Sequence, residues 1–67
     1  MFKTGEIVID ANHKNRHIVL TQSYEKQYTL VLNVDYSCSW FFTEDIIRTG
    51  ECYPQLKEMI DKLKEGV

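Results

Sequence analysis

Short apolar runs separated by polar turns fill the first two thirds of the chain. Residues 6–10 (EIVID), 16–22 (RHIVLTQ) and 27–36 (QYTLVLNVDY) are rich in β-branched and aromatic residues. Asn, Gly, Ser and charged residues separate these runs, which is typical of strands joined by tight connections. The pattern therefore predicts successive antiparallel strands in the first part of the chain.

The segment 27–36 alternates most clearly. Apolar side chains fall on one side of the predicted strand and mostly polar side chains on the other. An antiparallel strand with one face on a core produces this alternation. We therefore expect the core side to hold Tyr28, Leu30, Leu32, Val34 and Tyr36, opposite Thr29, Val31, Asn33 and Asp35.

The next strand predicted is the aromatic run that ends at residue 42, after a hairpin connection within residues 34–39 (VDYSCS). Neighbouring side chains of a strand point to opposite faces, so the three consecutive aromatic residues cannot share one side. We expect Trp40 and Phe42 in the core with Cys38, and Phe41 outside, under a C-terminal helix. Beyond this strand the sequence predicts a helical turn over Thr43, Glu44 and Asp45 capped by Thr43, a short strand at Ile46 and Ile47, and a turn at residues 48–52 (RTGEC).

The hydrophobic period changes near the C-terminal end. Within residues 53–66 (YPQLKEMIDKLKEG), the apolar residues recur at i, i+3, i+4 and i+7, the stripe of an amphipathic helix. Pro54 suits the first helical position and Gly66 the stop. We predict a helix over 53–65 that docks through Leu56, Met59, Ile60 and Leu63, with Glu58 and Lys62 as an exposed i, i+4 ion pair.

The order of these segments is similar to that of SH3-like small barrels. Residues 2–10 (FKTGEIVID) resemble the first strand of such barrels, and residues 41–46 (FFTEDI) resemble their ending. The resemblance covers residues 2–47 and implies a mainly β fold, a small antiparallel SH3-like barrel of four or five strands. The expected single domain, residues 1–67, then consists of a barrel at 2–48 and the added C-terminal α-helix at 53–65. The small, acidic and Tyr-rich chain also resembles phage and prophage accessory proteins in general type.

Charge and composition disfavour nucleic-acid binding, a membrane span and secretion. The chain has 67 residues with a net charge of −2 and a pI of about 5.5, which disfavours binding to phosphate backbones. No apolar run approaches the roughly 20 residues of a membrane span. The first ten residues do not have the pattern of a secretory signal, so we expect a cytoplasmic protein.

The residue types that carry chemistry are not arranged for it. Cys38 and Cys52 are expected to be free thiols in the core, because they do not form a C-x-x-C pair and an intracellular chain keeps its cysteines reduced. Two alternatives are less favoured: a disulfide between the two cysteines, and a Cys2His2 zinc site that they form with His13 and His17. We find no Gly-rich loop, no nucleophile elbow and no acid positioned to orient a histidine. The sequence therefore predicts a non-enzyme without cofactor or metal.

The remaining expectation is a protein-interaction module, such as a phage-type inhibitor or regulator of a host or partner protein. Surplus aromatic and acidic side chains in so short a chain favour binding to protein. The candidate contact residues are Tyr24, Phe41, Glu44, Asp45, Glu51 and Tyr53.

Two alternatives stay open from the sequence. A nucleic-acid-binding module would use the basic loop at residues 13–17, with Lys14, Arg16 and His17 on phosphates. A homodimer would pair the helix at 53–65 with its copy, which small size makes plausible.

Overall fold

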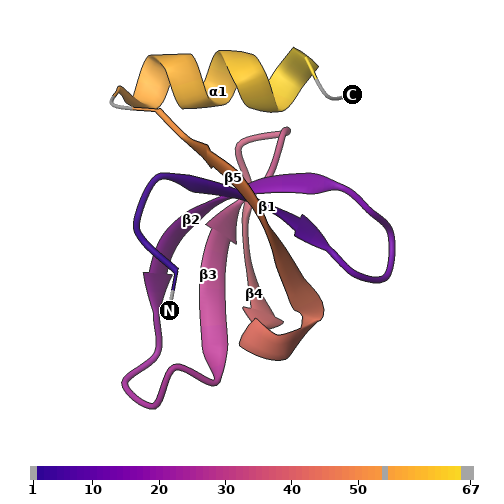
Figure 1. The fold of residues 1–67 in the computed structure, drawn as a ribbon, viewed down its shortest axis with the longest axis vertical. Coiled ribbons are helices and arrows are strands. Elements are labelled where there is room, and N and C mark those ends of the chain that lie inside the picture. Colours follow the sequence, from indigo (N-terminus) through magenta and orange to yellow (C-terminus); the bar gives the residue numbers. More distant parts are fainter. Residues whose placement is uncertain (1, 54, 66–67) are drawn as a thin grey trace.

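The chain folds into one sheet with one helix packed across it (Figure 1). The structure is a computed structural model and describes residues 2–53 and 55–65. The elements in chain order are β1 (Glu6–Asp10), β2 (Arg16–Gln22), β3 (Tyr28–Leu32), β4 (Cys38–Phe42), a 3-10 turn (Thr43–Asp45), β5 (Ile46–Cys52) and α1 (Leu56–Glu65).

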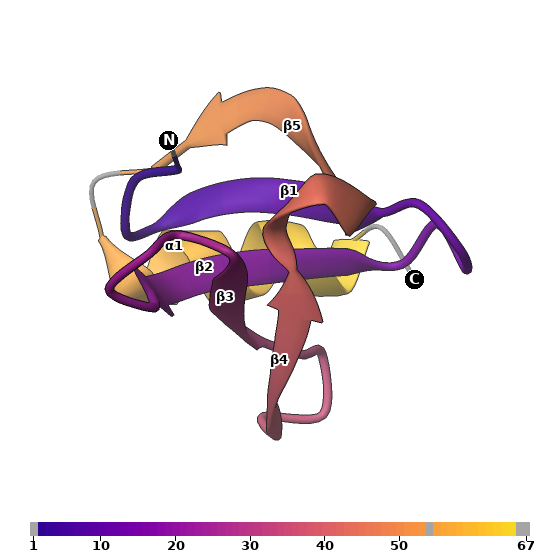
Figure 2. The same ribbon diagram turned by 90° about the horizontal axis from the view of Figure 1, so that it is seen from below.

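The strands form a single antiparallel sheet in the order β4-β3-β2-β1-β5. Strands β4 and β5 are the two edges, and Figure 2 shows them on opposite sides of the inner strands. Within the described residues the sheet is open between these edges. The mainly β fold with a C-terminal helix is thus confirmed, whereas the closure of a barrel is not.

The first strands lie where the sequence predicts them. β1 and β2 have the predicted bounds, and β3 ends at Leu32, before the predicted connection. In that connection the Asn33 N–H donates to the Ser37 carbonyl at 2.8 Å and the Tyr36 N–H to the Asn33 carbonyl at 3.0 Å. These bonds close the hairpin between β3 and β4, which the sequence located correctly without Gly or Pro to mark it.

Strand β5 is longer than predicted, and the turn expected at residues 48–52 is wrong. Arg48 pairs with Val8 of β1, and Cys52 pairs with Glu6 beyond a shift in register. Gly50 takes a φ of +85° in the strand, a conformation that glycine adopts without steric cost. The chain therefore stays paired with β1 through a segment whose Thr-Gly sequence predicts a turn.

The facing of β3 and β4 differs from the prediction, although Leu32 and Val34 pack against a core cluster as expected. Thr29 and Val31 are fully buried, whereas Tyr28 is 42% exposed. On β4, Trp40 is 56% exposed and Phe42 52% exposed, so their expected place in the core is wrong. Tyr36, also expected in the core, is exposed in the turn after β3.

Two apolar clusters on opposite sides of the sheet explain this inversion. Inside the curved sheet, Val8, Val19 and Val31 pack with Ile46, and Phe41 and Phe2 lie against them. On the other side, the helix packs on β1 and β2. Both faces of the inner strands are therefore buried, so alternation alone does not say which side is covered. The second cluster consists of Ile7, Ile18, Met59 and Leu63, with Leu32, Val34, Tyr53 and Ile60 against it.

Helix α1 confirms the predicted amphipathic stripe in its described part. Met59 and Leu63 are buried in the second cluster, and Ile60 packs beside them. The side chain of Leu56 and all of Pro54 and Gly66 lie outside the described residues. The expected pair of Glu58 with Lys62 is replaced, because the Lys62 ammonium lies 3.3 Å from Glu65.

Two smaller expectations also change. The predicted helical turn is present as a 3-10 turn, yet Thr43 does not cap it; its hydroxyl instead lies 2.8 Å from that of Thr29. Cys38 and Cys52 are free thiols, but both are exposed rather than in the core.

Candidate functional site

Large apolar side chains gather on the exposed face of the β3–β4 hairpin. We call this set the outer aromatic surface: Tyr28, Leu30, Trp40 and Phe42. Cross-strand register pairs Tyr28 with Phe42 and Leu30 with Trp40, so all four side chains point to one side. The rings of Tyr28 and Phe42 are tilted against each other, with centroids 5.1 Å apart. Adjacent exposed aromatics on a regular sheet are typical of binding surfaces.

This surface is exposed because α1 covers only the other end of the same sheet face. Leu32, at the end of β3, packs against the helix cluster. Leu30 and Tyr28 follow on the same side of the strand but progressively farther from the helix, and their exposure increases in that order. Figure 1 shows β3 and β4 extending away from α1. The helix therefore divides one apolar face into a buried half and an exposed half.

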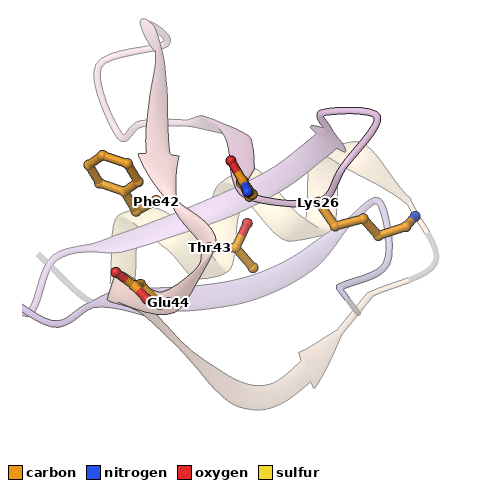
Figure 3. A pocket seen from close by; sticks show the side chains of 5 residues that line it. Lys26, Phe42, Thr43 and Glu44 are labelled. Atoms are coloured by element: carbon orange, nitrogen blue, oxygen red, sulfur yellow. The ribbon is translucent and has the colours of Figure 1, made fainter.

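A hollow of about 550 Å³ borders the surface where β4 ends. It is lined by Lys26, Gln27, Phe42, Thr43 and Glu44. Figure 3 shows the Phe42 ring and the Lys26 side chain pointing to opposite sides, with Thr43 between them. The hollow thus joins an aromatic wall to charged groups of both signs.

Phe41, predicted as an outer contact residue, points to the inside of the sheet. It packs against the cluster of Val8 and Val31, and its ring lies 5.0 Å from that of His17. The prediction that it lies outside under the helix is wrong, because its neighbours on β4 occupy the outer face. The aromatic contact residues that sequence reasoning missed are Tyr28, Trp40 and Phe42; a test of the opposite strand facing would have found them.

Glu51 and Tyr53, two further predicted contact residues, bind each other and a basic residue. The Tyr53 hydroxyl donates to Glu51 at 2.7 Å, and the Arg16 guanidinium donates to both Glu51 oxygens at 3.1 and 3.2 Å. The hydrogen bond from the Tyr53 hydroxyl lowers the pKa of Glu51. Partial burial raises this pKa, but the nearby Arg16 lowers it further, so the overall shift is downward. The carboxylate in turn raises the pKa of Tyr53. These groups fasten β5 to β2 rather than point outward together.

The other predicted contact residues are dispersed. Tyr24 is fully exposed in the turn between β2 and β3, and Glu44 is exposed at the hollow. Asp45 is partly buried, and its backbone carbonyl accepts a hydrogen bond from the Ala11 N–H at 2.8 Å. Of the predicted set, Tyr24 and Glu44 are therefore the ones that border the outer aromatic surface.

A buried polar network connects β1, β2 and the turn after β3. His17 is 5% exposed; its Nε2 lies 2.8 Å from Asp10 Oδ2 and its Nδ1 2.7 Å from Asn33 Oδ1. The Asn33 amide nitrogen donates to Ser37 and Ser39, which leaves its oxygen as the acceptor. Both imidazole nitrogens therefore face side-chain oxygen atoms, one of Asp10 and one of Asn33.

Asp10 is the acceptor on which this network depends. It is 1% exposed and also accepts the backbone N–H groups of His13 at 2.5 Å and Asn15 at 3.2 Å. Burial raises the pKa of Asp10, but the hydrogen bonds from His17, His13 and Asn15 outweigh it and lower the pKa overall. The sequence predicts no acid that orients a histidine, and this prediction is wrong, because Asp10 at the end of β1 binds His17.

The network changes the interpretation of the basic loop. His17 is buried and both its nitrogens are engaged, and Arg16 is held by Glu51. Lys14 is exposed in the turn, with a φ of +61°. The expectation that these three side chains reach phosphates together does not fit this arrangement. The contact of His17 with Asp10 instead joins β2 to β1 inside the molecule.

Searches for related proteins give no further guide. Comparison with protein-family models, with curated proteins and with solved structures found no match. Among residues 2–53 and 55–65, His, Cys, Asp and Glu side chains do not gather in groups of three or more that could hold a metal ion. In the same part of the chain, no helix is long and apolar enough to cross a membrane.

Proposed function

We propose that this chain is a non-enzymatic protein-interaction module that binds a host or partner protein through the outer aromatic surface, as a phage-type inhibitor or regulator. The observation that carries the proposal is the pair Trp40 and Phe42, each more than half exposed on a regular strand. Tryptophan and tyrosine are enriched among the residues that dominate binding energies. A cytoplasmic location stays a prediction from the sequence.

The contact set that we propose differs from the one expected from the sequence. It centres on Tyr28, Trp40 and Phe42, with Tyr24 and Glu44 at its border. Phe41 and Tyr53 are left out because they pack against the clusters inside the molecule. The partner would present an apolar surface that fits around Trp40 and a polar group for the rim at Glu44.

We also propose that the fold belongs to the SH3-like class. Two observations support this: the strand order β4-β3-β2-β1-β5, and the 3-10 turn between β4 and β5. Helix α1 is an addition to the minimal barrel and covers part of the outer face. The class itself carries no function, so the binding proposal depends on the surface alone.

Nucleic-acid binding through Lys14, Arg16 and His17 has less support. The contacts of Arg16 with Glu51 and of His17 with Asp10 use the groups that would otherwise face phosphate. Non-specific affinity for DNA or RNA depends on several clustered cations. Protein binding is therefore the function that we put forward.

Affinity capture from host lysate with matched variants tests the proposal. We expect the wild type and Ile47→Ser to recover one partner protein stoichiometrically, because Ile47 is 49% exposed but lies on the opposite edge. Trp40→Ser and Phe42→Ser should each lower the affinity for that partner by more than about tenfold, the effect of losing a binding hot spot. Equal recovery by all four chains, or no stoichiometric protein at all, would refute the proposal.

A further inference from the structure

Strand β4 has a row of backbone hydrogen-bonding groups that β3 does not use. In the register of this pair, residues whose numbers add to 70 lie opposite each other, as Leu30 and Trp40 do. The same register continues into both connections, where Asn33 N–H donates to Ser37 and Thr43 N–H to Gln27. Hydrogen-bonded and non-hydrogen-bonded pairs alternate along an antiparallel ladder. The odd-numbered residues of β4 therefore bond to β3, and the N–H and C=O groups of Cys38, Trp40 and Phe42 point away from the sheet.

This edge does not carry the features that usually prevent pairing. Residues 36–43 (YSCSWFFT) include no charged residue and no proline. The pairing of β4 with β3 runs without a bulge. Native edge strands are commonly protected by charges, proline, bulges or a cover. In the opposite edge strand, β5, Arg48, Glu51 and Gly50 supply charge and an irregular backbone.

We propose that β4 pairs antiparallel with β4 of a second copy of this chain, about a two-fold axis at Trp40. The outward groups are those of Cys38, Trp40 and Phe42, which are symmetric about Trp40. Trp40 then lies opposite Trp40 of the partner copy, and Cys38 lies opposite Phe42 of the partner copy. Each of these is a hydrogen-bonded pair that exchanges two backbone bonds. In this one register the outward backbone N–H and C=O groups of β4 all find partners in the second copy, and the two copies use the same surface, as a two-fold interface requires.

Charge favours this occupant as well. Because residues 36–43 are neutral, an antiparallel copy places no like charges opposite one another. An edge strand that carried charge would repel its own copy, whereas β4 meets only hydroxyl, thiol and aromatic side chains in its copy. A second copy therefore fits the edge without any change in sequence.

The pairing deepens the proposed function, on which its biological use depends. Two open sheets would join into one, and the outer aromatic surface of each copy would continue into that of the other. The partner protein would then contact two sets of Tyr28, Trp40 and Phe42 on one face. The homodimer that the sequence left open as an alternative would form through β4, not through helix α1.

Sedimentation of matched charge variants tests the two-fold register. We expect the wild type to pass from monomer to dimer with rising concentration. Trp40→Lys and Trp40→Glu should each weaken association by at least about tenfold, because identical charges meet at the axis. An equimolar mixture of these two variants should regain the dimer. Ile47→Lys, on the other edge, is the control and should behave as the wild type.

Oxidative crosslinking supplies a second measurement. In a background with Cys38→Ser and Cys52→Ser, the change Trp40→Cys places two thiols across the axis. Cα atoms of a hydrogen-bonded pair lie about 5.5 Å apart, within the range that a disulfide bridges. We expect a covalent dimer from this variant and none from Ile47→Cys in the same background.

Three results would overturn the β4 pairing. The first is a wild type that stays monomeric up to about 1 mM. The second is a dimer that Trp40→Lys leaves intact, and the third is a mixture of the two charge variants that stays monomeric. Partner capture by a monomeric wild type, lost in Trp40→Ser, would leave the proposed function in place while removing the pairing. The two proposals are thus tested separately.

Discussion

The two edge strands end one sheet in opposite ways. On β5, Arg48 and Glu51 form ion pairs within the molecule, and Gly50 gives the strand an irregular backbone. On β4 the register is regular, charged residues are missing, and Trp40 and Phe42 are exposed. One edge is fixed by internal contacts, while the other presents apolar side chains and unused backbone groups.

This difference shows that exposure alone does not identify a surface for binding. Ile47 on β5 is nearly as exposed as Phe42 on β4. Single exposed apolar residues are ordinary, whereas adjacent ones on an unprotected edge are not. The substitutions below therefore separate groups that stabilise the fold from groups that the fold leaves available.

The largest loss of stability is expected from Asp10→Ala, on the side of the sheet next to β5. The change removes the acceptor of His17 and of two backbone N–H groups in a buried site. Each buried donor left without its acceptor costs about 1–3 kcal/mol, and the change affects three donors, so we expect a loss of about 3–5 kcal/mol. A chain of this size has little more stability than that, so we expect it to be largely unfolded. Urea denaturation followed by circular dichroism measures the effect, and a loss below about 1 kcal/mol would contradict it.

The isosteric change Asp10→Asn gives the control and a dependence on pH. The pKa of Asp10 is lowered from its ordinary value of 3.8, so the folded state favours the carboxylate. Its contribution is complete above pH 3.8 and is lost as the pH falls through the lowered pKa. We expect Asp10→Asn to be less stable at neutral pH and to lose less stability than the wild type on acidification. Parallel acid-limb curves for both chains would contradict this.

Gly5→Ala should have the next largest effect, because it disturbs the docking of α1. Gly5 has a φ of +91°, and an added Cβ would lie 3.0 Å from the Met59 Cε. The backbone conformation costs about 1–2 kcal/mol and overpacking about 1–3 kcal/mol, giving about 2–5 kcal/mol. Gly50→Ala has a similar φ of +85° but no neighbour within 4 Å, so it should cost about 1–2 kcal/mol. Equal thermal stability of the two variants would contradict this difference, because it would mean that the Met59 side chain moves aside without cost.

Phe41→Ala and Phe42→Ala should differ strongly although the residues are adjacent on β4. Phe41 packs on the inner cluster and against the His17 ring. Because it is only partly buried, its loss should cost about 2–3 kcal/mol, less than the about 3–5 kcal/mol of a fully buried phenylalanine. Phe42 loses mainly its contact with Tyr28, worth about 0.5–1 kcal/mol. Chemical denaturation compares them directly. A larger loss for Phe42→Ala would restore the sequence-based assignment of the two faces.

The sequence determined the elements well and their facing poorly. The bounds of β1 and β2 and the stripe of α1 follow from local periods, which depend on neighbouring residues alone. Which side of β3 is buried depends on the other strands. Thr29, a polar residue, is buried because its hydroxyl meets Thr43 and Gln22 across the sheet. The sequence pattern around Thr29 carries no sign of those partners.

The sequence predicted what type of site to expect but not which residues form it. The excess of aromatic residues suggested a protein-binding surface, but the inverted facing assigned Trp40 and Phe42 to the core. The Asp10–His17–Asn33 network was missed because its members come from three separate segments. Long-range register brings them together, and no local spacing encodes it.

The smallest change in stability is expected from Trp40→Thr, although it removes the largest side chain of β4. Trp40 is 56% exposed, and threonine retains a high preference for strands. Exposed substitutions of this kind alter stability by less than about 0.5 kcal/mol. Ile47→Thr on β5 should change stability just as little, so the two edges should differ in association and not in folding. Denaturation at low micromolar concentration measures the monomer, and a loss above about 1.5 kcal/mol for Trp40→Thr alone would show that the fold itself depends on this side chain.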